Sequence, residues 1–412
     1  MIDRYCTPQM GLVWSDANKV LHWAVVEIEV MKAQGQLGIV PSDMHMHLEL
    51  TLRPSLEQVR AQEETLRHDL MAFLAAWKEN TEHEGVRRWL HYGLTSSDVV
   101  ETAQALILTQ ANVLIGNAGY TLLAELIVHA NEHRDTIRQG RTHGQAAEPT
   151  SWGYRVADIA LALARSLDRF VASADQVRVG HVSGPLGNYV HVPRDVEIAV
   201  CGALGLNVPD SSTQVLMRDS LGAWAYSLAN VVTVCEALAL EIRHGQRSEV
   251  AEIFEGTVRG QRGSSSMPHK RNPITAEKVS GLARLARSYV MPITEGIALW
   301  HERDISHSSV ERVALPDLCA ITEHVLLSTS DLVGKLDINH EGMRRNIKQE
   351  GTTTKMNRLI REGLSRDQAY EEARKLGLVE SCPAPQIDHT FEALARLRAM
   401  LAAAVAQGGV SL

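Results

Sequence analysis

The sequence predicts an all-α fold built around a bundle of long helices. Apolar residues recur with helical spacing over long stretches, whereas the strict alternation typical of strands is rare. Only 4 Phe and 8 Tyr occur, and Ala, Leu and Val dominate the apolar residues, which favours helix over sheet. At 412 residues the chain exceeds the usual size of a single hydrophobic core, so two or three domains are expected.

The long helices are expected in four stretches. In residues 225–242 the apolar side chains cover more than one face, so this helix must be buried on most sides. Residues 99–130 and 152–172 follow the same pattern, and Gly116 and Gly119 are points where the first could bend. Residues 276–300 make the fourth stretch. Helices of this length pack best side by side, and their broad apolar faces favour a homo-oligomer over a monomeric bundle.

Two stretches interrupt the helical pattern. Residues 180–194 are rich in turn formers and predict a small hairpin or an ordered loop. Residues 255–273 are rich in Gly and Ser. Candidate boundaries near Tyr92 and Asn339 predict three domains. They are an N-terminal helical domain (1–93), a central helical bundle (94–340) and a short C-terminal helical domain (341–412).

Composition narrows the class of protein. The formal net charge of −8 argues against a nucleic-acid partner. The five cysteines are far apart and form no Cys-x-x-Cys pair, which is typical of a reduced, cytoplasmic protein. The N-terminus does not resemble a signal peptide, and no run of about 18 apolar residues lacks charge, so no membrane span is expected.

Four polar clusters lie between the helical stretches, at residues 91–98, 140–145, 263–273 and 300–312. The third reads Gly-Ser-Ser-Ser-Met-Pro-His-Lys-Arg-Asn-Pro, and a solvent loop needs no such mixture of hydroxyls and cations. The fourth combines charges and hydroxyls, which suits either a solvated face or an anion site. The hydroxyls of the first could simply cap the following helix, and a lone histidine such as His143 is usually structural.

Taken together, the clusters suit proton abstraction next to a carboxylate. The dianion that forms must be stabilised by hydrogen-bond donors that are already in position, and Lys270 and Asn272 are candidates. A leaving nitrogen needs a general acid such as His143. A serine can act as the base only where its alkoxide is stabilised, and the residues leave open which of the three serines does so. The motifs of serine hydrolases, P-loop enzymes and dinucleotide-binding proteins are absent. Metal sites at His45, His47 and Glu49, or at His301, Glu302 and His307, rest on weak patterns.

The four clusters resemble, in the same order, the active-site segments of the fumarase/aspartase superfamily. The strings are Gly-Leu-Thr-Ser-Ser-Asp, Gly-Arg-Thr-His-Gly-Gln, the Met-Pro-His-Lys-Arg-Asn-Pro loop and Trp-His-Glu-Arg-Asp-Ile-Ser-His-Ser-Ser. The resemblance runs from residue 1 to about residue 370. It implies a three-domain helical fold, a homotetramer whose central helices form one bundle, and active sites assembled from three subunits. It also implies elimination of fumarate from a succinylated amine, without metal or cofactor.

The resemblance also implies roles for individual residues. Ser264 would be the general base and His143 the general acid, with Glu277 pairing with His143. His68 also matches a family active-site position. Implied contacts to the substrate are Arg4, Tyr5, Arg67, His91, Thr95, Ser96, Gln214, Met267, Lys270, Asn272, Arg303, Ser308 and Arg312. Of these, Arg4, Tyr5, Arg303, Ser308 and Arg312 match nucleotide contacts, which implies a succinylated purine nucleotide as substrate.

Some positions depart from the family pattern. Residues 351–356 read Gly-Thr-Thr-Thr-Lys-Met where the family has a Ser-x-Arg element, and Ser220 stands where an arginine is expected. These departures favour a second hypothesis, a lyase of the same superfamily acting on a non-nucleotide N-succinyl amine. A cycloisomerase of carboxymuconate shares the signature loop, but the string at 300–309 argues against it. A catalytically silent structural protein would lack the base, the acid or Lys270, and all three are present.

Overall fold

A computed structural model describes residues 2–256, 266–267, 269–347, 351–375 and 384–406. Its elements confirm the predicted all-α class, with two short two-stranded ladders as the only sheets among the described residues. Contacts divide the chain into two compact units. Unit 1 comprises residues 1–116, 168–230 and 285–324, and unit 2 comprises residues 117–167, 231–284 and 325–412. These boundaries fall inside long helices, so they do not test the three predicted domains.

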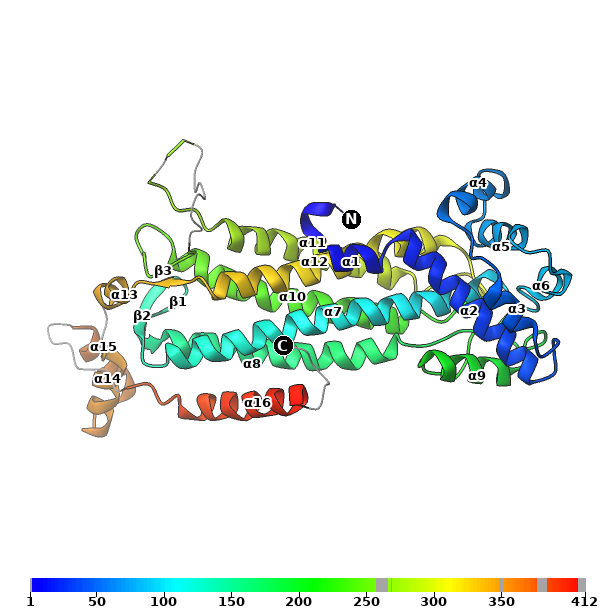
Figure 1. Cartoon of the computed structure of the whole chain (residues 1–412). Coiled ribbons are helices and arrows are strands. Elements are labelled where there is room, and N and C mark those ends of the chain that lie inside the picture. Colours follow the sequence, from blue (N-terminus) through cyan, green and yellow to red (C-terminus); the bar gives the residue numbers. More distant parts are fainter. Residues whose placement is uncertain (1, 257–265, 268, 348–350, 376–383, 407–412) are drawn as a thin grey trace. The chain divides into compact units, whose positions relative to one another are not determined.

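Five long helices each contribute residues to both units (Figure 1). They are α7 (Ser96–Glu132), α8 (Trp152–Gln176), α10 (Asp219–Gly245), α11 (Ile274–Glu295) and α12 (Ser306–Val333). The four predicted long helices are confirmed as α7, α8, α10 and α11, and α7 runs unbroken through Gly116 and Gly119. A Cβ atom on Gly119 would lie 2.5 Å from a methyl group of Leu167, so glycine permits the close approach of α7 and α8 in unit 2.

In unit 1 the shorter helices form a core beside the long ones. The aromatic rings of Trp23, Phe73 and Trp77 pack with centroids 5.7 and 5.3 Å apart. Their helices α2 (Asp16–Gln36) and α5 (Asp69–Glu79) follow clear start signals, since Ser15 and His68 accept backbone N–H groups at the two N-termini. The short elements are η1 (Asp3–Tyr5), α1 (Pro8–Val13), α2 (Asp16–Gln36), α3 (Met44–Leu50), α4 (Leu56–Leu66), α5 (Asp69–Glu79), α6 (Glu84–Trp89) and α9 (Arg194–Leu204).

Unit 2 contains both ladders. β1 (Ile137–Thr142) pairs antiparallel with β2 (Gln145–Ser151), and β3 (Ile253–Phe254) pairs with β4 (Asp337–Ile338). The remaining helices are α13 (His340–Asn346), α14 (Thr352–Arg361), α15 (Arg366–Arg374) and α16 (Asp388–Ala406). The hairpin of β1 and β2 is not predicted by the sequence, because its strands carry charges and glycine in place of alternating apolar residues. Residues 180–194 form an ordered loop whose first residues are buried, one of the two predicted outcomes.

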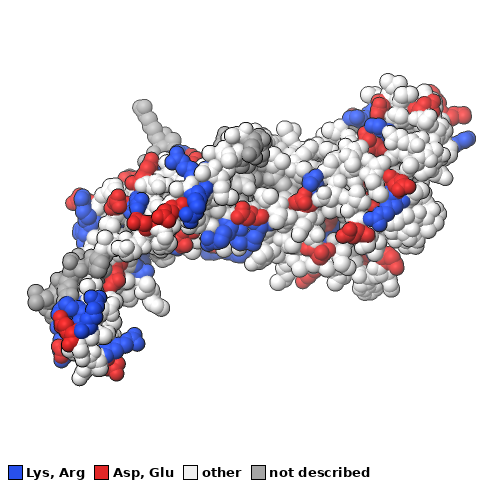
Figure 2. Space-filling model, turned by 90° about the horizontal axis from the view of Figure 1, so that it is seen from below, with Lys and Arg blue, Asp and Glu red and all other residues white. Residues whose placement is uncertain are grey.

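Two of the long helices leave much of their apolar surface uncovered. By length and composition alone, α7 and α10 each contain a window apolar enough to cross a membrane. Half or more of each window, 50% and 56%, is buried within the chain, and core helices of soluble proteins pass the same test. Side chains such as Val113 on α7 and Tyr226 on α10 are nevertheless exposed, by 57% and 62%. On the face shown in Figure 2, acidic and basic side chains are interspersed between wide uncharged areas.

Candidate functional site

A pocket in unit 1 collects five of the predicted site residues. Its volume is about 390 Å³, and its lining includes His68, Ser96, Arg303, Ser308 and Arg312. These residues come from the N-termini of α5, α7 and α12 and from the loop before α12. The pocket therefore brings together segments that are more than 200 residues apart in the sequence.

His68 and Ser96 form the hydroxyl-bearing side of the pocket. The Nδ1 atom of His68 caps α5 by accepting the backbone N–H of Met71 at 3.5 Å. The neutral ring then carries its proton on Nε2, which lies 3.3 Å from the Oγ atom of Ser96 and can donate to it. The cap thus sets which nitrogen of His68 faces the serine.

Two arginines form the cationic side. Arg303 donates to the side-chain oxygen of Gln214 at 2.9 Å, and Gln214 in turn donates to the carbonyl of Pro185 at 2.9 Å. The Nε atom of Arg303 is buried, and within the described part of the chain it has no hydrogen-bond partner. Arg312 donates to Asp69 at 2.7 Å and to Ser308 at 3.4 Å, and its side chain is 57% exposed. Arg312 therefore presents an exposed cation to the pocket, and Arg303 adds a guanidinium group that Gln214 holds in place.

A buried ion-pair network also lines this pocket. Arg218 donates to Glu311 at 3.0 Å and to Glu101, and Gln104 donates to Glu311 at 3.3 Å. Burial would raise the pKa of Glu101, but the charge of Arg218 outweighs burial and holds that pKa below its usual value. Burial dominates at Glu311, whose pKa is raised. The network fixes the α7 and α12 segments of unit 1 relative to each other.

The other predicted residues of unit 1 do not line the pocket. Arg4 is exposed in η1, and the ring of Tyr5 contacts His324 edge-on with centroids 5.2 Å apart. Arg67 ends α4 in the left-handed conformation, with φ of 53°. Thr95 directly precedes α7, and its backbone N–H donates to Asp98 at 2.7 Å.

His91 is engaged by a buried carboxylate. Its Nδ1 atom lies 2.6 Å from the Oε1 atom of Glu27, which is 1% exposed. Burial would lower the pKa of His91, but the Glu27 carboxylate outweighs burial and raises it. This ion pair ties α2 to the turn before α7. The role of His91 toward substrate stays a prediction.

Unit 2 carries the predicted acid and the carboxylate-binding segment. His143 lies exposed at the tip of the β1–β2 hairpin, with φ of 54°. Glu277 is exposed in the first turn of α11, and no hydrogen bond joins it to His143 among the described residues. Lys270 and Met267 are exposed, and Asn272 is half-buried. Ser264 lies outside the described residues. The predicted site is thus divided between the two units.

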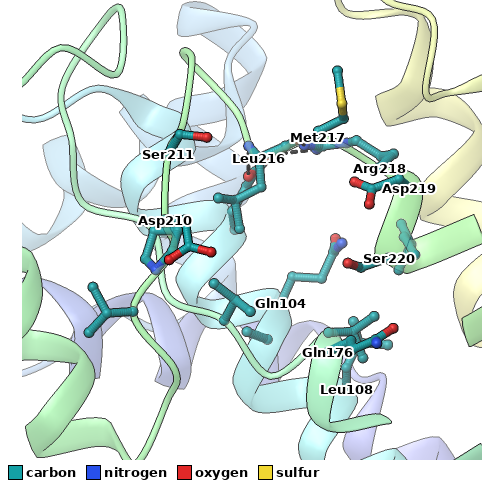
Figure 3. Close-up of a pocket in the computed structure, with 17 residues that line it drawn as sticks. Gln104, Leu108, Gln176, Asp210, Ser211, Leu216, Met217, Arg218, Asp219 and Ser220 are labelled. Atoms are coloured by element: carbon teal, nitrogen blue, oxygen red, sulfur yellow. Dashed lines mark hydrogen bonds and ion pairs between the residues drawn. The ribbon is translucent and has the colours of Figure 1, made fainter. Parts of the chain in front are cut away.

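The two departures from the family pattern lie elsewhere. Ser220 lines a second hollow of unit 1, of about 450 Å³, which Figure 3 shows with Gln104, Arg218 and Asp210 around it. It is not among the residues that line the first pocket. The 351–356 segment forms the start of α14 in unit 2, where Lys355 donates to the carbonyl of Glu372 at 3.2 Å.

One cluster has the composition of a metal site. Ligand atoms of His129, Glu132 and His133 lie within 4.8 Å of one another in unit 2. However, Trp152 donates its indole N–H to the Nε2 atom of His129 at 3.0 Å. In the neutral ring this leaves the proton on Nδ1, so neither nitrogen offers a free lone pair. Burial, assisted by His133, lowers the pKa of His129 to about 4 and keeps the ring neutral. The hydrogen bond from Trp152 thus occupies the His129 nitrogen that a metal ion would need.

Sequence reasoning did not identify several residues that support the site. Asp69, Glu101 and Glu311 hold the arginines of the pocket, and Glu252 holds the hairpin of His143. Asp69 carried one usable signal, because it directly follows His68 at the start of a helix. Glu311 carried another signal, because it belongs to the predicted polar cluster at 300–312 and directly precedes Arg312. Glu101 lies within a long helix and Glu252 directly precedes a short strand, where a glutamate is unremarkable.

Comparisons with known proteins show which family this chain belongs to. The sequence profile of the lyase family matches residues 17–287. Adenylosuccinate lyase of Synechocystis sp. is 41% identical over 374 residues, covering 90% of this chain and 86% of the relative. The adenylosuccinate lyases of Aquifex aeolicus and Bacillus subtilis are each 39% identical, over 401 and 375 residues. These alignments cover 95% and 90% of this chain, and 90% and 86% of the relatives.

Solved structures share the fold at lower identity. A fumarate lyase from Mesorhizobium sp. superposes with a TM-score of 0.81 at 23% identity, covering 91% of this chain and 87% of that chain. The 3-carboxy-cis,cis-muconate lactonizing enzyme from Pseudomonas putida also gives 0.81 at 23% identity, with 98% and 97% covered. At this identity they show the fold alone. Since the sequence relatives confirm the predicted superfamily, the chain is a C–N lyase that belongs to the lyase family, in the branch of the adenylosuccinate lyases.

Proposed function

We propose that this enzyme eliminates fumarate from adenylosuccinate to give AMP. By the same chemistry it would release fumarate from the succinylated carboxamide ribotide SAICAR to give AICAR, two steps of purine biosynthesis. The observation that carries the proposal is the unit 1 pocket, which presents Arg303, Ser308 and Arg312 beside His68 and Ser96. It occurs in a chain with about 40% identity to enzymes named adenylosuccinate lyase.

The reaction divides into one proton abstraction and one proton donation. Ser264, as alkoxide, removes the proton from the carbon next to a carboxylate of the succinyl group. Lys270 and Asn272 stabilise the dianion, and Met267, Thr95 and Ser96 complete the succinyl site. The C–N bond then breaks, the electron pair stays on nitrogen, and His143 supplies the proton. Glu277 stabilises the charged form of His143. Carbon loses one proton and nitrogen gains one, so no cofactor or metal is required.

The cationic side of the pocket suits the nucleotide half. Guanidinium groups bind phosphate oxygens through paired hydrogen bonds. Arg303 and Arg312 are placed to do so, and Arg4 and Tyr5 would add to the phosphate site. Gln214, which accepts from Arg303 at 2.9 Å, would contact substrate together with it.

We further propose a homotetramer with shared active sites, located in the cytoplasm. The acid and the carboxylate-binding segment lie in one unit and the pocket in the other, which suits a site assembled from several chains. Exposed apolar side chains on the long helices support burial against other subunits, since Tyr226 is 62% and Met291 is 69% exposed.

The alternative substrate is a non-nucleotide N-succinyl amine. It is favoured by the 351–356 segment, which offers no arginine, and by Ser220. Two arginines retained in the pocket, Arg303 and Arg312, oppose it, because a substrate without phosphate has no use for them.

The deciding experiment incubates the purified enzyme with adenylosuccinate and follows AMP and fumarate. A panel of non-nucleotide N-succinyl amines is assayed in parallel, and His143→Ala serves as the inactive control. We expect turnover of adenylosuccinate that the control lacks. Turnover of a panel compound without turnover of adenylosuccinate would reject the proposal in favour of the alternative. Turnover of neither would favour a catalytically silent protein.

A further inference from the structure

Arg141, on the strand that leads to His143, is held by a buried carboxylate. Its Nη1 and Nη2 atoms donate to the two oxygens of Glu252 at 3.0 and 2.6 Å. Such a two-pronged pair fixes direction as well as distance. Glu252 has an exposed fraction of 0%, whereas the side chain of Arg141 is 30% exposed. A residue near the tip of an exposed hairpin is therefore anchored at a point in the core of unit 2.

Glu252 is itself fixed from three sides. Its backbone N–H donates to Gly245 at 2.9 Å, and its carbonyl accepts the N–H of Asn339 at 2.9 Å. Its Oε1 atom also accepts from the side chain of Asn346, on α13, at 2.9 Å. The anchor of Arg141 is therefore joined to the end of α10, to Asn339 at the N-terminus of α13, and to Asn346 at the end of that helix.

The hairpin connects the anchored Arg141 to His143 through a short turn. Only His143 and Gly144 connect the strands, with φ of 54° and 73°, the combination of a tight type I′ turn. Arg141 pairs with Ala146 across the ladder, two residues from His143. A Cβ atom on Gly140 would lie 2.2 Å from the carbonyl oxygen of Glu148, so the strands are in close contact just below the tip. The direction of the tip thus follows that of Arg141.

We propose that Arg141 and Glu252 are positioning residues for the general acid. They do not touch substrate, and they act by holding the hairpin so that His143 points where the leaving nitrogen will be. The inference rests on the proposed function, because it assigns a purpose to the orientation of His143. A misplacement of about 1 Å at an acid group is enough to cost on the order of 100-fold in rate.

The same strand supplies a matched control. Arg138, three residues before Arg141, donates to Glu241 at 3.1 Å, and Glu241 also accepts from Arg155 at 3.0 Å. This is a second arginine–glutamate pair on β1, at the base of the hairpin and away from the tip. Glu241→Gln should therefore loosen only the base of the hairpin, around Arg138, without redirecting His143.

The kinetic test compares Glu252→Gln, Arg141→Lys, the double variant and Glu241→Gln. For Glu252→Gln we expect kcat for adenylosuccinate to fall about 10- to 100-fold while KM changes less than about threefold. Because the two residues act as a unit, the double variant should lose no more than the worse single variant. Equal losses in Glu241→Gln, or losses that multiply in the double variant, would overturn the proposal. Arg141→Lys keeps the charge and provides the same comparison if Glu252→Gln does not fold.

Amide hydrogen exchange separates this inference from the proposed function. Peptides covering residues 139–147 should exchange faster in Glu252→Gln than in the wild type, and at the wild-type rate in Glu241→Gln. This measurement needs no substrate. It therefore tests whether Glu252 and Arg141 hold the hairpin even if the wild type does not turn over adenylosuccinate. Unchanged exchange in Glu252→Gln would overturn the inference whatever the activity.

Discussion

The Nη2 atom of Arg312 lies 2.7 Å from the Oδ2 atom of Asp69, so the second turn of α12 is tied to the first residue of α5. Burial alone would raise the pKa of Asp69. The hydrogen bond and charge of Arg312 outweigh burial and hold that pKa below its usual value. A guanidinium group that is 57% exposed, yet held at one end, is oriented for an anion entering the pocket.

Asp69→Asn should weaken substrate binding by releasing Arg312. The amide keeps the shape of the carboxylate but loses its charge, so the arginine is no longer oriented in advance. We expect KM for adenylosuccinate to rise by about 3- to 10-fold with kcat nearly unchanged. Steady-state kinetics test this, and Arg312→Gln should raise KM at least as much. A fall in kcat alone would contradict it.

Arg218→Met should be strongly destabilising. It leaves Glu101 and Glu311 buried without their cation, and breaking a buried pair in this way costs about 3–5 kcal/mol. The loss should be smaller at pH 5 than at pH 8, because protonation neutralises unpaired carboxylates. Urea unfolding at both pH values measures it. The control is Arg60→Met, which breaks an exposed pair with Asp16 and should cost less than about 1 kcal/mol. Equal effects of the two variants would refute the assignment.

The pair of His91 and Glu27 should make stability depend on pH. The folded-state pKa of His91 is raised, so the pair's contribution is fully present below the unfolded value of about 6.5. It is lost as pH rises through the folded-state pKa. The wild type should therefore exceed Glu27→Gln in free energy of unfolding by more at pH 6 than at pH 9. Denaturant titrations at both pH values check this, and a larger gap at pH 9 would show the opposite sign.

Ser264→Ala and His143→Ala should each lower kcat by several orders of magnitude, because each removes a proton-transfer group. The circular dichroism spectrum and the midpoint of thermal unfolding should stay unchanged, since His143 is an exposed tip residue. Single-turnover measurement of fumarate release tests both variants. Near-normal activity in Ser264→Ala would reject it as the base and direct attention to Ser265 or Ser266.

Shared active sites predict complementation between inactive variants. Mixing His143→Ala, altered in unit 2, with His68→Ala, altered in unit 1, should restore part of the activity. Mixed tetramers then contain sites with both native residues. Activity is assayed after subunit exchange, which is verified by native mass spectrometry. No recovery despite exchange would indicate that each site lies within one chain.

Apolar spacing predicted four of the five long helices, and it predicted neither α12 nor the hairpin. Apolar spacing in 225–242 and 99–130 predicts helices because side chains three or four residues apart lie on the same face of a helix. The strands around His143 have no such pattern, since Arg138 and Arg141 alternate with polar residues and Gly140. Their pairing depends on partners elsewhere, such as Glu252, which lies 111 residues from Arg141.

The sequence by itself determined the class of fold, the lyase family and the identity of the chemical groups. Helical periodicity and short motifs involve residues close together in the chain, so both can be recognised from the sequence. Only the tertiary structure decided which groups meet. It joined Arg312 to Asp69 across 243 residues and placed Arg303, Ser308 and Arg312 in one pocket with His68 and Ser96. It also showed that Ser220 lines a different hollow from the one that contains those residues. Contacts between distant segments depend on the path of the chain and the packing of its helices, and no local pattern encodes either.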